Sequence, residues 1–306
     1  MGRKRRGRLV DGILVLDKPP GMTSNGALQR VKRLFDAAKA GHTGSLDPLA
    51  TGVLPLCLGE ATKFSQYVLD ADKGYLSTFV LGIGTDTLDA EGEETSREDA
   101  AHLTKDQVLE AMASLTGAIE QIPPMYSAIK RDGQPLYKLA RQGLEIERKA
   151  RSVIIHRFEL LAFRPGKAVE VDVDILCTKG TYIRSLAESL GQALGLPAHV
   201  SVLRRSLAGP YSLAQAVTLD HLETVAERTP EQLDALLMPM DGPLDALPGV
   251  VIGESAVYYL KRGQPVLVPN GPRDGMVRAY AAGGAFLGIG EMLDDGRLAP
   301  RRLVNP

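Results

Sequence analysis

The chain has 306 residues, of which 44% are hydrophobic and 24% charged, a composition typical of a soluble globular protein long enough for two domains. It lacks an apolar run near the roughly 20 residues that a membrane-spanning helix needs, and its two cysteines, Cys57 and Cys177, lie in apolar sequence, so we expect neither a membrane-spanning helix nor a disulfide framework. The net charge is −1, which by itself does not indicate nucleic-acid binding.

The N-terminal segment MGRKRRGRLV is basic and is not followed by the apolar core of a signal peptide, so we expect a cytoplasmic protein. The segment DGILVLDKPPGMTS then predicts a short buried strand over residues 13–16 and a Lys-Pro-Pro-Gly turn. Thr23 and Ser24 can cap the helix that follows. The apolar stripe of that helix comprises Ala27, Val31, Leu34, Phe35 and Ala38.

The middle of the chain alternates between strand and helix patterns. GYLSTFVLGIG predicts a strand, and the acidic segment after it predicts an exposed loop. TKDQVLEAMASLTG predicts a helix that begins with a capping box of Thr104 and Gln107 and ends at Gly117. IPPMYSAIKRDGQPLYKLARQG, punctuated by Pro and Gly, predicts a loop with one short helix.

Two further segments show clear periodicity. KAVEVDVDILC alternates, with Val169, Val171, Val173 and Ile175 on one face, and predicts a half-exposed antiparallel strand. TYIRSLAESLGQALG predicts an amphipathic helix closed by Gly195. A linker is expected near residues 239–249, and the Gly-rich remainder predicts a small, mostly β domain with a hairpin around Gly283 and Gly284.

The charges are unevenly distributed. Basic residues crowd the N-terminus and form the pairs Arg204–Arg205 and Arg301–Arg302, whereas acids gather in GIGTDTLDAEGEETSREDA. This polarity is compatible with a basic face for phosphates, although ordinary solvated surface explains most of the individual charges equally well. The five histidines are scattered without metal-ligand spacing and the phosphate-binding glycine motifs are missing, so we expect neither a metal nor a nucleotide cofactor.

Asp47 is the residue of greatest chemical interest. It lies in GHTGSLDPLATGVLPLCLGEATK, directly before Pro48, which biases its backbone to an extended conformation outside any helix. Such an aspartate can cap its own turn, or it can serve as a nucleophile or general base. A glycosidase would need a second carboxylate as its acid, and none is evident close by in the sequence.

GHTGSLDPLATGVLPLCLGEATK resembles the central motif of the TruB family of tRNA pseudouridine synthases. Four further segments resemble that family's motifs in the same order: DGILVLDKPPGMTSN, DKGYLSTFVLGIGTDTLDAEG, PPMYSAIKRDGQPLYKLARQG and CTKGTYIRSLAESLGQALG…AHVSVLRRS. The C-terminal segment resembles a PUA domain, an RNA-binding module. The resemblance implies an α+β catalytic domain over residues 11–247, with a large mixed, mainly antiparallel sheet flanked by helices. It also implies a basic extension over residues 1–10 and a β-rich PUA-like domain over residues 248–306.

The activity that the resemblance implies is the conversion of uridine to pseudouridine at position 55, in the TΨC loop of tRNA, without a metal or redox cofactor. Asp47 matches the family's essential aspartate, and attack at C1′, attack at C6 and proton removal remain open routes. Tyr75 matches a tyrosine that stacks on the target base, and Arg184 an arginine that pairs with the aspartate. The implied partner is the TΨC arm of tRNA, and we expect a monomer.

The resemblance also implies roles for residues around the substrate. Tyr182 and Leu203 match pocket residues that pack against the uracil, and His42 matches a histidine that lies beside the RNA in the space of a flipped nucleotide. Lys18 and Pro19 match the first motif, which buttresses the active-site loop. We therefore expect all five to be substrate-binding residues, next to the three catalytic ones.

Two other functions remain compatible with the sequence. One is a guide-RNA-dependent pseudouridine synthase of the dyskerin type, which shares the Asp47 motif. The other is an RNA-binding or tRNA-folding protein whose catalysis is secondary. The chain lacks the long lysine-rich tails of the first class, and the intact set of Asp47, Tyr75 and Arg184 favours a catalyst over the second.

Overall fold

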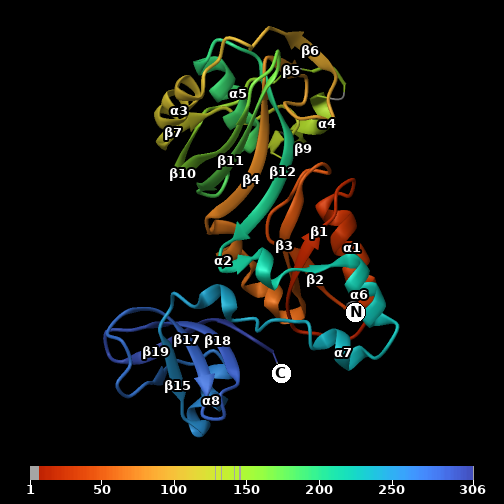
Figure 1. Ribbon diagram of the computed structural model, residues 1–306. Coiled ribbons are helices and arrows are strands. Elements are labelled where there is room, and N and C mark those ends of the chain that lie inside the picture. Colours follow the sequence, from red (N-terminus) through yellow and green to blue (C-terminus); the bar gives the residue numbers. More distant parts are fainter. Residues whose placement is uncertain (1–6, 128, 132, 141, 145, 306) are drawn as a thin grey trace.

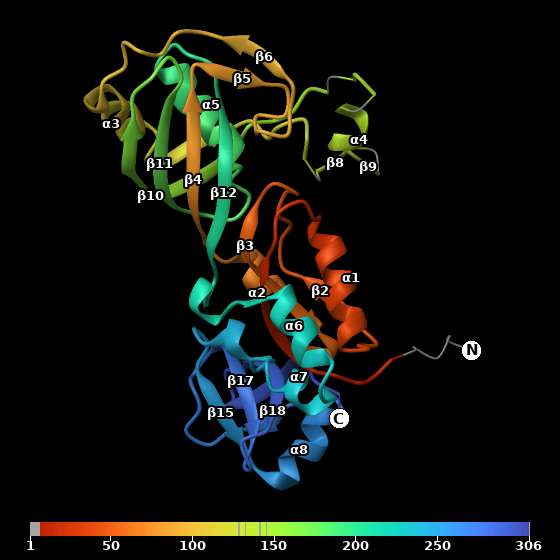
Figure 2. The same ribbon diagram turned by 45° about the vertical axis from the view of Figure 1, so that its right-hand side comes forward.

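The computed structural model describes residues 7–127, 129–131, 133–140, 142–144 and 146–305. The molecule is elongated, with a large sheet through its upper and middle parts and a smaller C-terminal sheet at one end (Figures 1 and 2). Residues 1–6 of the predicted basic extension lie outside the described residues. Arg8, from the same extension, forms an ion pair with Asp234 at 2.5 Å.

The large sheet has the strand order β14-β1-β3-β12-β4-β11-β10-β7, with β13 beside β12 and β2 beside β3. Its strands are β1 (Gly12–Lys18), β2 (Ala40–His42), β3 (Thr51–Leu58), β4 (Lys73–Leu81), β7 (Gly117–Gln121), β10 (Arg151–Arg164), β11 (Val169–Cys177), β12 (Ala198–Ala208), β13 (Tyr211–Ser212) and β14 (Val217–Thr218). The pairs β1–β14 and β3–β12 are parallel and the others antiparallel. The predicted mixed, mainly antiparallel sheet is therefore confirmed.

Helices flank this sheet, and their ends follow the predicted capping chemistry. They are α1 (Ser24–Leu34), η1 (Gly59–Lys63), α2 (Ser65–Asp70), α3 (Lys105–Ser114), α4 (Leu136–Ala140), α5 (Ile183–Ala193), η2 (Leu213–Gln215), α6 (Leu219–Ala226), α7 (Pro230–Asp234) and η3 (Gly242–Leu244). The side chain of Thr23 accepts from the backbone of Gly26 at the start of α1, and Thr104 and Gln107 form the predicted capping box of α3. No helix within the described residues is long and apolar enough to cross a membrane.

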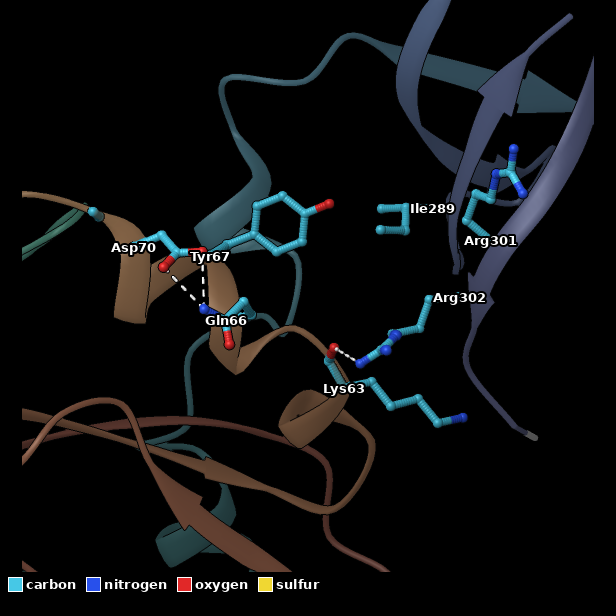
Figure 3. A pocket seen from close by; sticks show the side chains of 8 residues that line it. Lys63, Gln66, Tyr67, Asp70, Ile289, Arg301 and Arg302 are labelled. Atoms are coloured by element: carbon cyan, nitrogen blue, oxygen red, sulfur yellow. Dashed lines mark hydrogen bonds between the residues drawn. The ribbon is translucent and has the colours of Figure 1, made fainter. Parts of the chain in front are cut away.

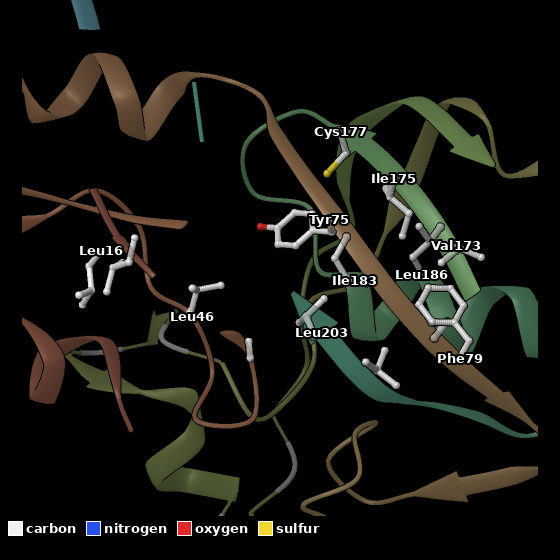
Figure 4. Packing of buried hydrophobic residues seen from close by; sticks show 14 of the residues in the cluster. Leu16, Leu46, Tyr75, Phe79, Val173, Ile175, Cys177, Ile183, Leu186 and Leu203 are labelled. Atoms are coloured by element: carbon white, nitrogen blue, oxygen red, sulfur yellow. The ribbon is translucent and has the colours of Figure 1, made fainter. Parts of the chain in front are cut away.

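The main core runs along the sheet, from α1 and α6 at one end to α5 at the other. Val173 and Ile175 on β11 are fully buried, as their alternation predicts, and they face Leu186 of α5 and Phe79 of β4 (Figure 4). Each such side chain contributes roughly 1.5–3 kcal/mol through burial. This core fixes α5 against β4 and β12, and all three elements contribute residues to the site described below.

The acidic segment differs from the exposed loop that we expected. It forms a hairpin of β5 (Ile83–Thr85) and β6 (Glu94–Arg97), and between these strands Asp89 is buried. The side chain of Thr87 donates to the Asp89 carboxylate at 2.6 Å and the backbone of Glu91 does so at 3.1 Å. Asp89 is therefore not part of a solvated acidic surface, because its hydrogen-bond partners hold it inside.

The C-terminal unit consists of β15 (Gly249–Ile252), α8 (Glu254–Lys261), β16 (Val266–Leu267), β17 (Gly275–Ala281), β18 (Phe286–Met292) and β19 (Arg297–Leu303). Its five strands follow the order β15-β17-β18-β19-β16 and enclose their own apolar core. The predicted hairpin joins β17 to β18, with Gly284 at φ 84°. The unit packs against the segment before α2, where Phe64 meets Phe286 edge to face at 5.3 Å between ring centroids. The short strands β8 (Lys130–Arg131) and β9 (Gln134–Pro135) complete the fold.

Candidate active site

Asp47 lies on a turn between β2 and β3 that is held from two sides. The Ser24 hydroxyl donates to the backbone oxygen of Leu46 at 3.0 Å and accepts from its backbone nitrogen at 2.7 Å. The Lys18 ammonium donates to the backbone oxygen of Pro48 at 3.3 Å. Because the residues on both sides of Asp47 are anchored, its carboxylate projects from a fixed position, as preorganised catalysis requires.

Arg184 is buried in the first turn of α5, where its side chain is 5% exposed. One guanidinium nitrogen lies 2.9 Å from the Asp47 carboxylate and the other 3.5 Å from that of Asp89. The same two nitrogens donate to the backbone oxygens of Tyr126 at 2.8 Å and Thr87 at 2.9 Å. The cation is thus fixed between two carboxylates and cannot swing away from Asp47.

The electrostatic environment of Asp47 is finely balanced. Its side chain is 40% exposed, yet the carboxylate is recessed and loses much of its hydration to the surrounding chain. This desolvation raises the pKa of the Asp47 carboxyl above its ordinary value, and the Asp89 anion adds to the rise. Arg184 lowers the pKa, but it does not cancel desolvation. The result is a poorly solvated carboxylate that is held against a buried cation.

A pocket of about 320 Å³ opens beside this carboxylate. Its lining brings together five residues that the family resemblance implicated: Asp47, Tyr75, Tyr182, Arg184 and Leu203. They come from the turn before β3, from β4, from the start of α5 and from β12, which are far apart in the sequence. The fold therefore assembles one cavity with a carboxylate, a buried cation, two phenols and an apolar wall.

Tyr75 lies where the main core meets the pocket. It is 9% exposed, and Figure 4 shows its ring at the end of the row of apolar side chains, with its hydroxyl directed toward the segment that carries Leu46. Burial raises the pKa of Tyr75, while the Arg205 cation acts against that rise. The side chain is consequently a neutral phenol at neutral pH, and it lines the cavity.

Three of the predicted substrate-binding residues are not among the residues that line the pocket. Lys18 is fully buried behind the turn, where it donates to the backbone oxygens of Pro19 at 2.8 Å and Met22 at 2.6 Å, and burial lowers its pKa to about 8. Lys18 thus positions the Asp47 turn rather than facing a ligand, and Pro19 belongs to the same support. His42, on β2, is half-buried, and its Nδ1 lacks a hydrogen-bond partner among the described residues.

Sequence reasoning missed three charged residues near this cavity. Arg205 and Lys73 line the pocket although both are buried, and Asp89 supports Arg184 from behind. The sequence suggested that Arg205 is half of a basic surface pair. Only its neighbour Arg204 reaches the surface, where it forms an ion pair with Asp17 at 2.7 Å. Strand alternation could have separated the two arginines, but it could not have said which one faces inward.

A second hollow, of about 610 Å³, lies between α2 and the C-terminal sheet (Figure 3). In it Gln66 donates to Asp70 at 2.9 Å, and Arg302 donates to the backbone oxygen of Lys63 at 2.8 Å. Asp70 is also held by Lys179 at 2.8 Å on the exposed surface. The hollow is larger than the Asp47 pocket, but its charged groups are solvated and tied to one another, so we assign the chemistry to the smaller pocket.

Three family descriptions match consecutive parts of the chain. Residues 32–183 match the TruB family pseudouridylate synthase N-terminal domain, residues 184–245 the tRNA pseudouridylate synthase B C-terminal domain, and residues 248–304 the C-terminal region of pseudouridine synthase II TruB.

Among curated proteins, the tRNA pseudouridine synthase B of Saccharophagus degradans is 53% identical over 99% of this chain and 98% of its own length. That of Pseudomonas aeruginosa is 57% identical over 98% of both chains. Among solved structures, a chain in the crystal structure of a Cbf5-Nop10-Gar1 complex resembles this one with a TM-score of 0.72 and 27% identity, over 97% of this chain and 86% of that one.

Proposed function

The chain belongs to the TruB family of pseudouridine synthases, and we propose that it converts uridine to pseudouridine in tRNA, at position 55 of the TΨC loop. The observation that carries this proposal is the Asp47 carboxylate, held at 2.9 Å by a buried arginine at the edge of a pocket that also presents an aromatic ring. The tRNA substrate follows the names of relatives that are 53% and 57% identical along nearly the whole chain.

The reaction breaks the bond between ribose C1′ and uracil N1 and makes a bond between C1′ and C5. The uracil loses a proton at C5 and gains one at N1, so no atom is added from another substrate. In each of the three routes the Asp47 carboxylate acts in its ionised form, as a nucleophile at C1′ or C6 or as a base. Incomplete solvation leaves the carboxylate reactive, and Arg184 favours its charged form and holds it in place.

Access to the pocket requires the target nucleotide to leave its stack. Extrusion costs a few kcal/mol, and stacking on an aromatic side chain returns roughly 1–3 kcal/mol per base. Tyr75 supplies such a ring, and Leu203 and Tyr182 line the same pocket. We propose that these three side chains hold the flipped uracil while Asp47 acts on it.

The purified chain acting alone distinguishes this proposal from its two alternatives. The assay uses an unmodified tRNA transcript that carries tritium at C5 of its uridines, because isomerisation releases that tritium to water. A guide-dependent enzyme would be inactive without its guide RNA, and a pure RNA-folding protein would release no tritium. A transcript with cytidine at position 55 tests the proposed site, and it should remain unmodified.

Asp47→Asn is the matching variant of the protein, because it keeps the shape of the side chain and removes its charge. We expect turnover to be lost while tRNA affinity stays within a few-fold of wild type. Asp106→Asn, at an exposed position of α3, serves as the control and should keep full activity. Near wild-type turnover by Asp47→Asn would refute the role given to this carboxylate.

A further inference from the structure

Arg205 is one of the most deeply buried side chains in the molecule, although it carries a full charge. It is 2% exposed, and among the described residues it forms no ion pair with a carboxylate. A buried cation is normally paired with an anion, because its desolvation otherwise costs several kcal/mol. Arg184 follows this rule with Asp47 and Asp89. Arg205 does not, although it lines the same pocket.

Three neutral groups surround the Arg205 guanidinium. Its Nε donates to the backbone oxygen of Val53 at 2.7 Å, and its Nη2 donates to that of Gly44 at 3.3 Å. The third is the hydroxyl of Tyr75, which lies directly opposite Arg205 in the pairing of β4 with β12. Because Tyr75 and Arg205 are cross-strand neighbours and both line the same pocket, the phenol and the guanidinium lie side by side there.

The backbone of Arg205 is fixed as firmly as its side chain. Gly52, at φ 99°, pairs with Arg205 where β3 meets β12, and a Cβ at Gly52 would lie 2.2 Å from the backbone oxygen of Arg205. Only a glycine permits this approach. The guanidinium is therefore held in the pocket beside the phenol of Tyr75.

We propose that Arg205 is a positioning residue for the isomerisation, and that its guanidinium holds the Tyr75 hydroxyl in the place from which it exchanges protons with the flipped uracil. The inference rests on the proposed function, because it concerns the same pocket. It explains why a cation is buried there without a carboxylate. The anion that would complete the pair exists only during the reaction, as the phenolate of Tyr75.

The proton transfers balance within this pair. Once C5 has bonded to C1′, N1 of the uracil takes the proton of the phenol, which leaves a Tyr75 phenolate beside the Arg205 cation. The phenolate then removes the proton from C5 and becomes a neutral phenol again. The uracil gains one proton and loses one, and both side chains return to their initial state. A nearby guanidinium stabilises the transient phenolate by charge and by hydrogen bonding.

A double-mutant cycle tests this coupling by single-turnover tritium release at saturating enzyme. Wild-type activity is measured first, and an inactive wild type would contradict the proposed function rather than this inference. We expect Arg205→Gln to slow the step about 10²-fold, as misplacing a reacting group does, and Arg205→Lys to slow it less because the charge remains. In the Tyr75→Phe background the same Arg205→Gln substitution should slow the step by less than about twofold.

Arg204→Gln is the matched control. It removes the neighbouring arginine on the same strand, whose side chain pairs with Asp17 and is 35% exposed, and it should leave the rate within about twofold of wild type. Equal losses from Arg205→Gln with and without the Tyr75 hydroxyl would overturn the proposal, because a purely structural arginine acts on both enzymes alike. Weakened tRNA binding at an unchanged rate would overturn it too and would make Arg205 a phosphate contact.

A spectroscopic measurement decides the case in which Tyr75→Phe has too little activity for the cycle. The ¹³C resonance of the tyrosine Cζ reports hydrogen bonding of the hydroxyl, and Tyr75→Phe assigns the signal of Tyr75 among the nine tyrosines. We expect this signal to shift in Arg205→Gln and to stay unchanged in Arg204→Gln. If Arg205→Gln fails to fold, Arg205→Lys is compared instead. An unchanged signal in a folded Arg205 variant would contradict the inference.

Discussion

Replacing Arg184 with methionine should cost the protein more stability than any surface ion pair could. Removing one partner of a buried pair leaves the other charge uncompensated, which costs about 3–5 kcal/mol. The Asp47 side chain is 40% exposed and can regain water, whereas that of Asp89 is 5% exposed and cannot. Most of the loss therefore arises from Asp89, and we expect the lower end of the range, about 3 kcal/mol.

A second substitution should recover much of that loss. Asparagine at position 89 keeps an oxygen that accepts from the Thr87 side chain and the Glu91 backbone, while it removes the buried charge. We expect Arg184→Met/Asp89→Asn to regain at least half of the stability that Arg184→Met loses. The double variant should still be a poor catalyst, because Asp47 no longer has its cation.

Urea unfolding followed by circular dichroism measures these differences, and pH gives the decisive comparison. Without Arg184, protonation removes the buried negative charge, so the deficit of Arg184→Met relative to wild type should be largest at neutral pH and should shrink as the pH falls. Lowering the pH should change the stability deficit of Arg184→Met/Asp89→Asn relative to wild type much less, because the buried carboxylate is already gone. A variant Arg184→Met as stable as wild type at neutral pH, or equally deficient at every pH, would refute the account of Arg184 as the cation between two carboxylates.

Three further predictions concern the reaction and the RNA. Because the inferred proton transfer needs the Tyr75 hydroxyl, Tyr75→Phe should bind tRNA normally but turn it over poorly, and Tyr75→Leu, which also loses the ring, should be poor as well; an active Tyr75→Phe would limit the ring to stacking. The single-turnover rate should rise with pH as Asp47 ionises and should then level off. The midpoint of this rise should lie above 3.8, the ordinary pKa of an aspartate, because the pKa of Asp47 is raised. A midpoint at or below 3.8 would contradict the raised pKa. Arg297, Arg301 and Arg302 should be replaced together by uncharged residues. The slope of the logarithm of tRNA affinity against the logarithm of salt concentration should then become shallower, by at most about 0.7–0.9 for each phosphate that these side chains would otherwise neutralise. Lys105→Gln on α3 is the control, and an unchanged slope would exclude these arginines from the RNA interface.

Local chemistry made much of the fold predictable. The alternation of β11, the cap of α1 by Thr23 and the capping box of α3 depend on residues a few positions apart, and the structure confirms each of them. The helix α8 was not predicted, since the Gly-rich sequence around it favoured strands. Local sequence signals do not predict the topology of the sheet either. The parallel pairing of β3 with β12 joins segments about 150 residues apart, and it depends on tertiary packing rather than on a local sequence pattern.

The site was predictable only as far as the family resemblance reached. Asp47 alone allowed two interpretations, and the structure favours the chemical one by placing a buried cation against its carboxylate. Asp89 appeared to belong to an acidic surface because six more acids surround it in sequence, and only the tertiary fold reveals that it turns inward. The charges of an exposed segment and of a buried one look the same in a sequence, since burial depends on distant neighbours.

The two arginines on β12 show most clearly what determines the role of a residue here. Adjacent positions of a strand face opposite sides of the sheet, so one of the pair must point toward the pocket and the other away. A shift of one residue in the register would exchange the two arginines and place Arg204, which pairs with Asp17, in the pocket. The close approach of Gly52 to the backbone of Arg205 opposes that shift, because it would bring Thr51 or Val53, which carry a Cβ, to the place of Gly52. A glycine in the segment that carries Asp47 thus determines which cation faces Tyr75, and it links the position of the carboxylate to that of the phenol.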